Sequence, residues 1–170
     1  MDVKAIKTTL AGMLGSMYKL DPITGLATTQ HIRANAQAPL SLPETDLPTW
    51  VMFTGAGIYP NPPDQTVERF SRESRDIVCC LYICYTQAGI DGEAERKVEP
   101  YLDYARGVIQ SHPLLYDGQI SDIVPGIMRA FLIKDDGIVV MKYGKTPSVY
   151  DGLRFTIRIE ALNEATYGNE

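Results

Sequence analysis

The chain has 170 residues, a mass of 18.9 kDa, 45% hydrophobic and 22% charged residues, and a formal net charge of -5. This length fits a single domain over residues 1–170, and the composition excludes wholesale disorder. The negative charge argues against a dedicated nucleic-acid-binding protein, which needs a basic surface to displace counterions from phosphates.

Export and membrane insertion are not expected. Charged residues such as Lys4 and Lys7 interrupt the apolar residues near the N-terminus, where a signal peptide needs a continuous apolar run. The longest apolar stretch, Ile77 to Tyr85, is too short to cross a bilayer as a helix. We therefore expect an intracellular protein without membrane contact.

The three cysteines all lie in that apolar stretch. If it is a strand, Cys80 and Cys84 share a face but lie about 13 Å apart, because a strand rises about 3.3 Å per residue. That distance is beyond the reach of a disulfide bond. An odd number of clustered thiols fits a reducing compartment, and we expect buried free cysteines.

The N-terminal third predicts one helix followed by a long loop. Apolar residues recur at helical spacing from Val3 to Met17, and Asp2 is placed to cap the first turn. The helix should end before Asp21-Pro22, because the residue before a proline disfavours helical geometry. Residues 21–48 are polar and rich in proline, which predicts an irregular connection over the surface.

Two strands are predicted in the middle of the chain. Thr49 to Thr54 forms the first, which should end at a Gly55-Ala56-Gly57 turn. Residues 59–76 begin with several prolines and continue with charged residues, so a second irregular loop is expected there. Ile77 to Thr86 is apolar on both faces, which indicates a central strand.

A long amphipathic helix is predicted from Glu93 to Ser111, with an apolar stripe opposite a charged face. Pro100 either kinks this helix or occupies the first turn of a shorter one.

Three strands are predicted near the C-terminus. Two apolar runs, Ile127 to Lys134 and Ile138 to Tyr143, flank Asp135-Asp136-Gly137, a combination that predicts a hairpin. Leu153 to Leu162 alternates apolar and polar residues, as in a half-exposed antiparallel strand, and residues 163–170 are expected to fray. The predicted fold class is α+β, with a mainly antiparallel sheet and two helices packed on one face.

Patterns that carry catalytic chemistry are incomplete. Gly55-Ala56-Gly57 lacks the third glycine and the helix of a dinucleotide-binding turn. Gly144-Lys145-Thr146 resembles the end of a phosphate-binding loop, but Val139 stands where the first glycine is required. Neither His31 nor His112 has the spacing of a zinc ligand. We expect no catalytic residue, cofactor or metal, although a cysteine–histidine pair that meets only in space stays open.

The second predicted loop has features of a protein interface. Three arginines spaced by three residues lie there with two aromatic residues nearby, and interfaces favour both residue types. A solvated loop whose arginines pair with Glu68 and Glu73 explains the same pattern. With the two aspartates of the predicted hairpin turn, the candidate interface residues are Tyr59, Arg69, Phe70, Arg72, Arg75, Asp135 and Asp136.

The order of these segments resembles a known family. After the amphipathic N-terminal helix, the matching segments are TWVMFTGAG, a charged loop leading to ESRDIVCCLYICY, then EAERKVEPYLDYARGVIQSHPLL and SVYDGLRFTIRIEAL. In the last of these, Tyr150, Gly152 and Phe155 introduce an alternating final strand. The layout is similar to that of the tail-completion, or tail terminator, proteins of long-tailed bacteriophages, the minor tail protein U group.

This resemblance implies a structural function without catalysis. It implies a small α+β subunit that forms a six-membered ring on the tail tube, halts tube polymerisation and offers a surface to the head connector or head-closure protein. The protein would then assemble in the host cytoplasm and reside in the virion tail or neck. Two alternatives stay open: another neck protein, such as a head-closure or adaptor subunit, and a small ligand-binding domain or enzyme with a cleft beside Ile77–Thr86.

Overall fold

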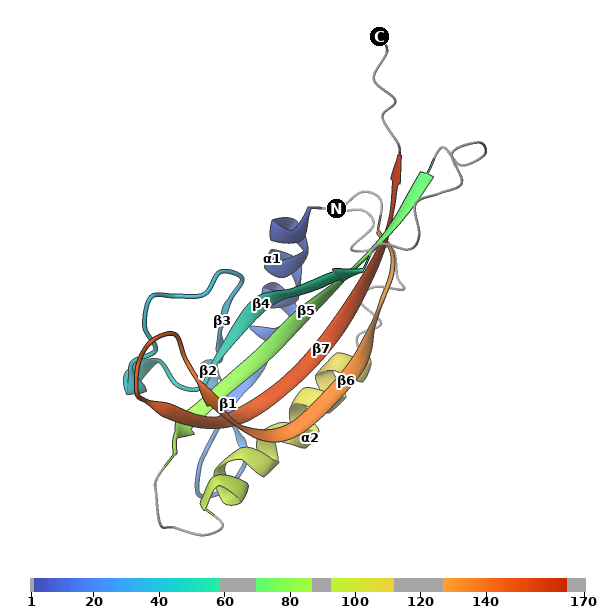
Figure 1. The fold of residues 1–170 in the computed structure, drawn as a ribbon. Helices are drawn as coiled ribbons and strands as arrows, with labels where there is room; N and C mark the ends of the chain where they lie inside the picture. Colours follow the sequence, from blue (N-terminus) through green and yellow to red (C-terminus); the bar gives the residue numbers. More distant parts are fainter. Residues whose placement is uncertain (1, 59–69, 87–92, 112–126, 165–170) are drawn as a thin grey trace.

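The computed structural model describes residues 2–58, 70–86, 93–111 and 127–164, and it has the predicted α+β fold (Figure 1). In chain order the elements are α1 (Val3–Leu14), β1 (Tyr18–Leu20), β2 (Ala27–His31), β3 (Arg33–Asn35), the 3-10 helix η1 (Glu44–Asp46), β4 (Thr49–Ile58), β5 (Phe70–Tyr85), α2 (Glu93–Ser111), β6 (Ile127–Lys142) and β7 (Val149–Glu164).

The main sheet has five strands in the order β3-β4-β5-β7-β6. All neighbouring pairs are antiparallel except β3 and β4, which are parallel. Strands β1 and β2 form a separate two-stranded sheet. Figure 1 shows the long strands β5, β7 and β6 as a curved layer with α1 and α2 on the same side of it. The predicted arrangement of two helices on one face is therefore confirmed.

Helix α1 begins at its predicted cap and ends earlier than expected. The Asp2 carboxylate accepts a hydrogen bond from the Ala5 backbone N–H at 3.0 Å. The helix ends at Leu14, and a Cβ added to Gly15 would lie 2.9 Å from the carbonyl oxygen of Ala11. Met17 therefore lies beyond the helix, but it is still completely buried.

The helix side of the sheet holds the larger core. Apolar side chains from both helices pack there against alternate residues of the sheet strands, and Trp50 and Phe155 lie at its centre with ring centroids 6.2 Å apart. Its members from the helices include Ile6, Leu10, Leu14, Val98, Tyr101 and Ala105, and those from the strands include Met52, Ile77, Cys79, Leu81, Leu153 and Ile157.

The opposite face of the sheet is covered in part by residues 39–47, which we call the strap. Leu42 of the strap is buried in a second, tyrosine-rich cluster. The hydroxyls of Tyr85 and Tyr150 both donate to the Leu42 carbonyl oxygen, at 3.3 and 3.0 Å, and the Tyr143 hydroxyl donates to that of Pro39. The prediction of an irregular surface connection over residues 21–48 was therefore wrong where the segment forms β2, β3 and η1, and where Ile32 and Leu42 are buried in the cores.

Strands β4 and β5 are longer than predicted. Strand β4 continues through Gly55-Ala56-Gly57, where the sequence predicted a turn, and its register against β5 shifts between Thr54 and Gly57. A Cβ on Gly55 would lie 2.9 Å from the Asp76 carbonyl oxygen, so the glycine permits a close approach of the two strands. Strand β5 begins at Phe70, inside the predicted second loop.

The predicted hairpin at Asp135-Asp136-Gly137 is absent from the described β6. Residues Ile127–Lys142 form one strand, and both halves pair with β7. The register shifts between Asp135 and Ile138, and Gly137 has a φ of 66°. A glycine at positive φ is typical of a β-bulge as well as of a turn, and the neighbouring β7 is long enough to pair with both halves.

The last strand and the cysteines differ in detail from the predictions. Strand β7 starts at Val149 and lies between β5 and β6, while residues 165–170 of the predicted frayed tail lie outside the described residues. A register shift between Tyr82 and Cys84 places Cys84 against the helix-side core, whereas Cys80 belongs to the tyrosine-rich cluster, so the two cysteines do not share a face. All three cysteines are free, as expected, but only Cys79 and Cys80 are buried and Cys84 is half-buried.

Candidate functional site

The predicted interface residues do not form one loop. Tyr59 and Arg69 lie outside the described residues. Phe70 and Arg72 belong to strand β5, whose backbone pairs them with Glu164 and Leu162 of β7. The charged pattern that suggested a loop therefore belongs, from Phe70 onward, to a strand that pairs with a neighbour.

Arg75 is engaged within the molecule. One of its terminal nitrogens lies 3.0 Å from Glu73 Oε1, and both side chains are mostly shielded from solvent. The neighbouring Asp76 accepts two hydrogen bonds from Arg158, at 2.8 and 3.0 Å. Pairing with Glu73 was the alternative explanation for this arginine, and it is the arrangement found.

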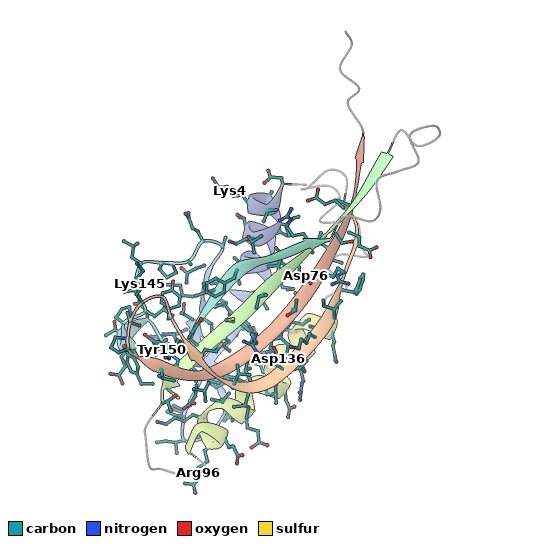
Figure 2. The ribbon with its side chains drawn as sticks, viewed as in Figure 1. Lys4, Asp76, Arg96, Asp136, Lys145 and Tyr150 are labelled. Carbon is teal, nitrogen blue, oxygen red and sulfur yellow. The ribbon has the colours of Figure 1, made fainter. Side chains whose placement is uncertain are left out.

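Asp135 and Asp136 fix the bulge of β6 to its surroundings. Asp135 accepts from Arg106 Nε of α2 at 2.5 Å and from the Gly137 backbone N–H at 2.8 Å. Asp136 lies 2.9 Å from Lys134 Nζ and accepts from Arg154 Nε at 2.6 Å (Asp136 is labelled in Figure 2). These two hydrogen bonds hold the pKa of Asp136 below its usual range, and the one from Lys134 has the larger effect. Both aspartates thus have a structural explanation.

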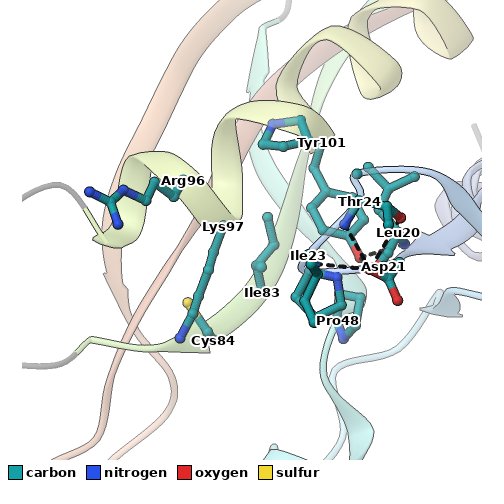
Figure 3. Close-up of a pocket in the computed structure, with 13 residues that line it drawn as sticks. Leu20, Asp21, Ile23, Thr24, Pro48, Ile83, Cys84, Arg96, Lys97 and Tyr101 are labelled. Carbon is teal, nitrogen blue, oxygen red and sulfur yellow. Dashed lines mark hydrogen bonds between the residues drawn. The ribbon is translucent and has the colours of Figure 1, made fainter.

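A pocket of about 410 Å³ lies where the β1–β2 hairpin meets the N-terminal half of α2 (Figure 3). Volumes of about 300–1,000 Å³ are typical of ligand-binding pockets. The lining residues are Leu20, Asp21, Pro22, Ile23, Thr24, Gly25, Pro48, Ile83, Cys84, Arg96, Lys97, Pro100 and Tyr101.

Tyrosine hydroxyls of α2 attach the hairpin beside this pocket. The Tyr101 hydroxyl accepts from the Leu20 backbone N–H at 2.8 Å and donates to the Leu20 carbonyl oxygen at 3.4 Å. The Tyr104 hydroxyl accepts from the Tyr18 backbone N–H at 3.1 Å. These contacts hold β1 against α2 and leave the pocket open between them.

The tip of the hairpin is an ordered turn. Asp21 Oδ1 accepts from the backbone N–H groups of Thr24 and Ile23, at 2.8 and 2.9 Å, which lowers the pKa of Asp21. Gly25 has a φ of 70°, and its N–H donates to the Asp21 carbonyl oxygen. This turn nevertheless exposes two aliphatic side chains, because Ile23 is 91% and Leu26 is 70% exposed. The turn therefore presents an apolar surface beside the pocket.

The pocket combines apolar walls with two cations and the Asp21 carboxylate. Prolines, Ile83 and the Tyr101 ring supply the apolar surface, and Arg96 and Lys97 come from neighbouring positions of α2. In Figure 3 Lys97 extends toward Cys84, whereas Arg96 points away from the helix on the other side. An apolar group that carries or adjoins an anion would fit such a site best.

His31, Cys79 and Cys80 do not line the pocket. His31 lies with Nδ1 3.2 Å from the Ser16 carbonyl oxygen and stacks on Tyr18. His112 lies outside the described residues. Burial raises the pKa of the Cys79 and Cys80 thiols, which therefore stay protonated at neutral pH.

Other exposed apolar side chains lie away from the pocket. Leu40 of the strap is fully exposed. Strand β6, the last strand of the sheet, exposes Val140 strongly and Phe131 and Ile133 partly. Exposed apolar residues thus occur on three surfaces: the hairpin tip, the strap and the β6 edge.

The sequence patterns did not reveal the pocket, because its lining comes from segments far apart in the chain. Among residues 2–58, 70–86, 93–111 and 127–164, no cluster of three or more His, Cys, Asp or Glu residues is arranged to hold a metal ion. Within the same ranges, no helix has the length and apolar character needed to cross a membrane. Neither a scan against protein-family models nor a search of curated proteins gives a significant match.

Proposed function

We propose that this chain is a tail terminator of a long-tailed bacteriophage. In this proposal the subunit has no enzymatic activity and forms a ring, a hexamer by resemblance, on the end of the tail tube. The ring stops tube polymerisation and joins the tube to the head connector or head-closure protein. It assembles in the host cytoplasm and becomes part of the virion neck.

The observation that carries the proposal is the separation of the exposed apolar side chains. They lie on unlike surfaces, represented by Ile23 on the hairpin tip, Leu40 on the strap and Val140 on the β6 edge. A ring closes through heterologous interfaces, in which one surface of a subunit contacts a different surface of its neighbour. Further apolar surface is then available for the tube and the connector. A monomer with one substrate would need only one such surface.

The first test is the mass of the protein in solution, measured by light scattering and combined with negative-stain images. A closed ring of six chains of 18.9 kDa has a mass of about 113 kDa. A ring of that mass with a central channel supports the proposal. A compact dimer that ignores tail tubes contradicts it. If the protein is a monomer, its recruitment to the ends of purified tail tubes decides between a tail terminator and a head-closure protein. A head-closure protein would not cap the tubes.

The pocket favours one competing function, a ligand-binding domain. Its position beside Ile83 and Cys84 matches the cleft expected next to the central strand, and its cations suit an anionic ligand. A thermal-shift screen with small carboxylates and phosphates tests this alternative. Saturable stabilisation that is lost in Arg96→Ala would favour the ligand-binding function. The absence of stabilisation would favour a protein partner as the occupant of the pocket.

A further inference from the structure

The strap presents an apolar side chain and a carboxylate on an ordered support. Leu40 is fully exposed, and Glu44, at the start of η1, is exposed as well. Between them Leu42 is buried and its carbonyl oxygen accepts from two tyrosine hydroxyls. A surface that is already fixed loses little conformational entropy on binding, which favours its use as a contact.

The pocket is complementary to this part of the strap. It offers apolar walls for an aliphatic side chain, and its two cations, Arg96 and Lys97, suit a nearby carboxylate. Its rim adds the exposed side chain of Ile23. The strap thus carries the projecting group and a negative charge. The pocket carries the hollow and two cations, which outnumber its one carboxylate, Asp21.

The two surfaces lie on opposite faces of the sheet. Leu42 packs in the tyrosine-rich cluster on one face, whereas Ile83 and Tyr101, which line the pocket, belong to the helix-side core. Figure 1 shows the segment between β3 and β4 at the left of the sheet and α2 behind it. Pro48, which follows the strap, lines the pocket of the same chain, but Leu40 is fully exposed and does not occupy that pocket. A contact between Leu40 and the pocket would therefore join two copies.

We propose that Leu40 of one copy inserts into the pocket of a neighbouring copy, with Glu44 facing Arg96. The contact rests on the proposed function and names the interface between adjacent ring subunits. In the proposed ring the contact is heterologous, because each copy uses its strap on one neighbour and its pocket on the other. The same contact made reciprocally by two copies would instead close a two-fold dimer, so the size of the assembly distinguishes the two arrangements.

The pocket contains a natural probe of this contact, since partly buried Cys84 lines it. A Leu40→Cys chain treated with the thiol oxidant diamide should form disulfide bonds between residue 40 of one copy and Cys84 of the next. A non-reducing gel should then show a ladder of dimers, trimers and larger products. The ladder should be lost in Leu40→Cys/Cys84→Ser. It should also be absent from Lys4→Cys, which places a thiol on the exposed side of α1.

The possible outcomes separate the contact from the proposed function. Products that persist in Leu40→Cys/Cys84→Ser contradict a strap-to-pocket contact. Cys84-dependent products that stop at the dimer contradict its place in a ring. A Leu40→Cys chain that gives no more product than wild type contradicts it as well, even if the protein caps tail tubes. A Cys84-dependent ladder from a protein that does not cap tubes would establish the contact and overturn the tail terminator function.

Discussion

The hydroxyl of Tyr150 on the final strand donates a 3.0 Å hydrogen bond to the carbonyl oxygen of Leu42, which lies 108 residues earlier in the chain. The bond is buried, and it joins the strap to the sheet face opposite the helices. The position of the strap therefore depends on contacts with the final strand, which is distant in the sequence. The same contacts place the exposed Leu40.

Replacing Tyr150 with phenylalanine should lower the free energy of unfolding by about 1 kcal/mol, because one buried hydrogen bond is lost. The loss stays modest because Tyr85 still donates to the same carbonyl. Urea denaturation monitored by circular dichroism measures the change. Tyr18→Phe, at a half-exposed ring, is the matched control and should change little. Equal effects in the two variants would show that the strap does not depend on Tyr150.

Two leucines of the strap should respond in opposite ways to truncation. Leu42 is buried, so Leu42→Ala should cost about 3 kcal/mol through lost burial and the cavity left behind. Leu40 is fully exposed, so Leu40→Ala should change the stability of the monomer by less than about 0.5 kcal/mol. Chemical denaturation of both variants tests this difference. A large loss at Leu40 would mean that its side chain packs within its own chain.

A pair of glycines offers a second internal comparison. A Cβ at Gly152 of β7 would lie 1.9 Å from the Leu81 carbonyl oxygen and 2.8 Å from Met141 Cε, so Gly152→Ala should destabilise the fold by about 3 kcal/mol or more. A Cβ at Gly107 of α2 meets nothing within 4 Å. Gly107→Ala should therefore stabilise the protein by about 0.5–1 kcal/mol. Thermal unfolding of the two variants should show shifts of opposite sign.

The protein should lose stability at alkaline pH. Burial raises the pKa of the Cys80 thiol from 9.0 to about 11, and it raises the pKa values of Cys79 and Tyr82 as well. Because the unfolded chain releases these protons more readily, the stabilisation is complete below pH 9 and is lost as the pH rises through the folded pKa of Cys80 near 11. Urea denaturation between about pH 8 and pH 10.5 measures the slope. Cys79→Ala/Cys80→Ala should have a shallower slope, and an unchanged slope would exclude these thiols as the cause.

The elements with strong local periodicity could be predicted from the sequence. The bounds of α2 follow from its apolar stripe and from the turn residues around it, and the helix runs through Pro100 without ending. The alternation from Leu153 to Leu162 correctly predicted a strand. It did not reveal that this strand is central, because which strands become its neighbours is decided by the rest of the chain.

The remaining features depend on contacts between distant residues. The Asp-Gly pair at residues 136 and 137 has the same local signature in a turn and in a bulge, and the pairing with β7 decides between them. Likewise, the strap has no periodic pattern that could predict its position. Tyrosines of β5, of β7 and of the loop before β7 hold it in place, and they lie far away in the chain. The pocket had one local signal, the aliphatic residue Ile23 in a polar segment.

The proposed capping of tail tubes is tested most directly by polymerising purified tail tube protein with and without this chain. Tube lengths and tube ends are then measured in electron micrographs. The proposal predicts that added protein stops elongation and appears as a ring at a tube end, in proportion to the number of ends. Tubes that grow to the same lengths, with bare ends at saturating protein, would contradict it.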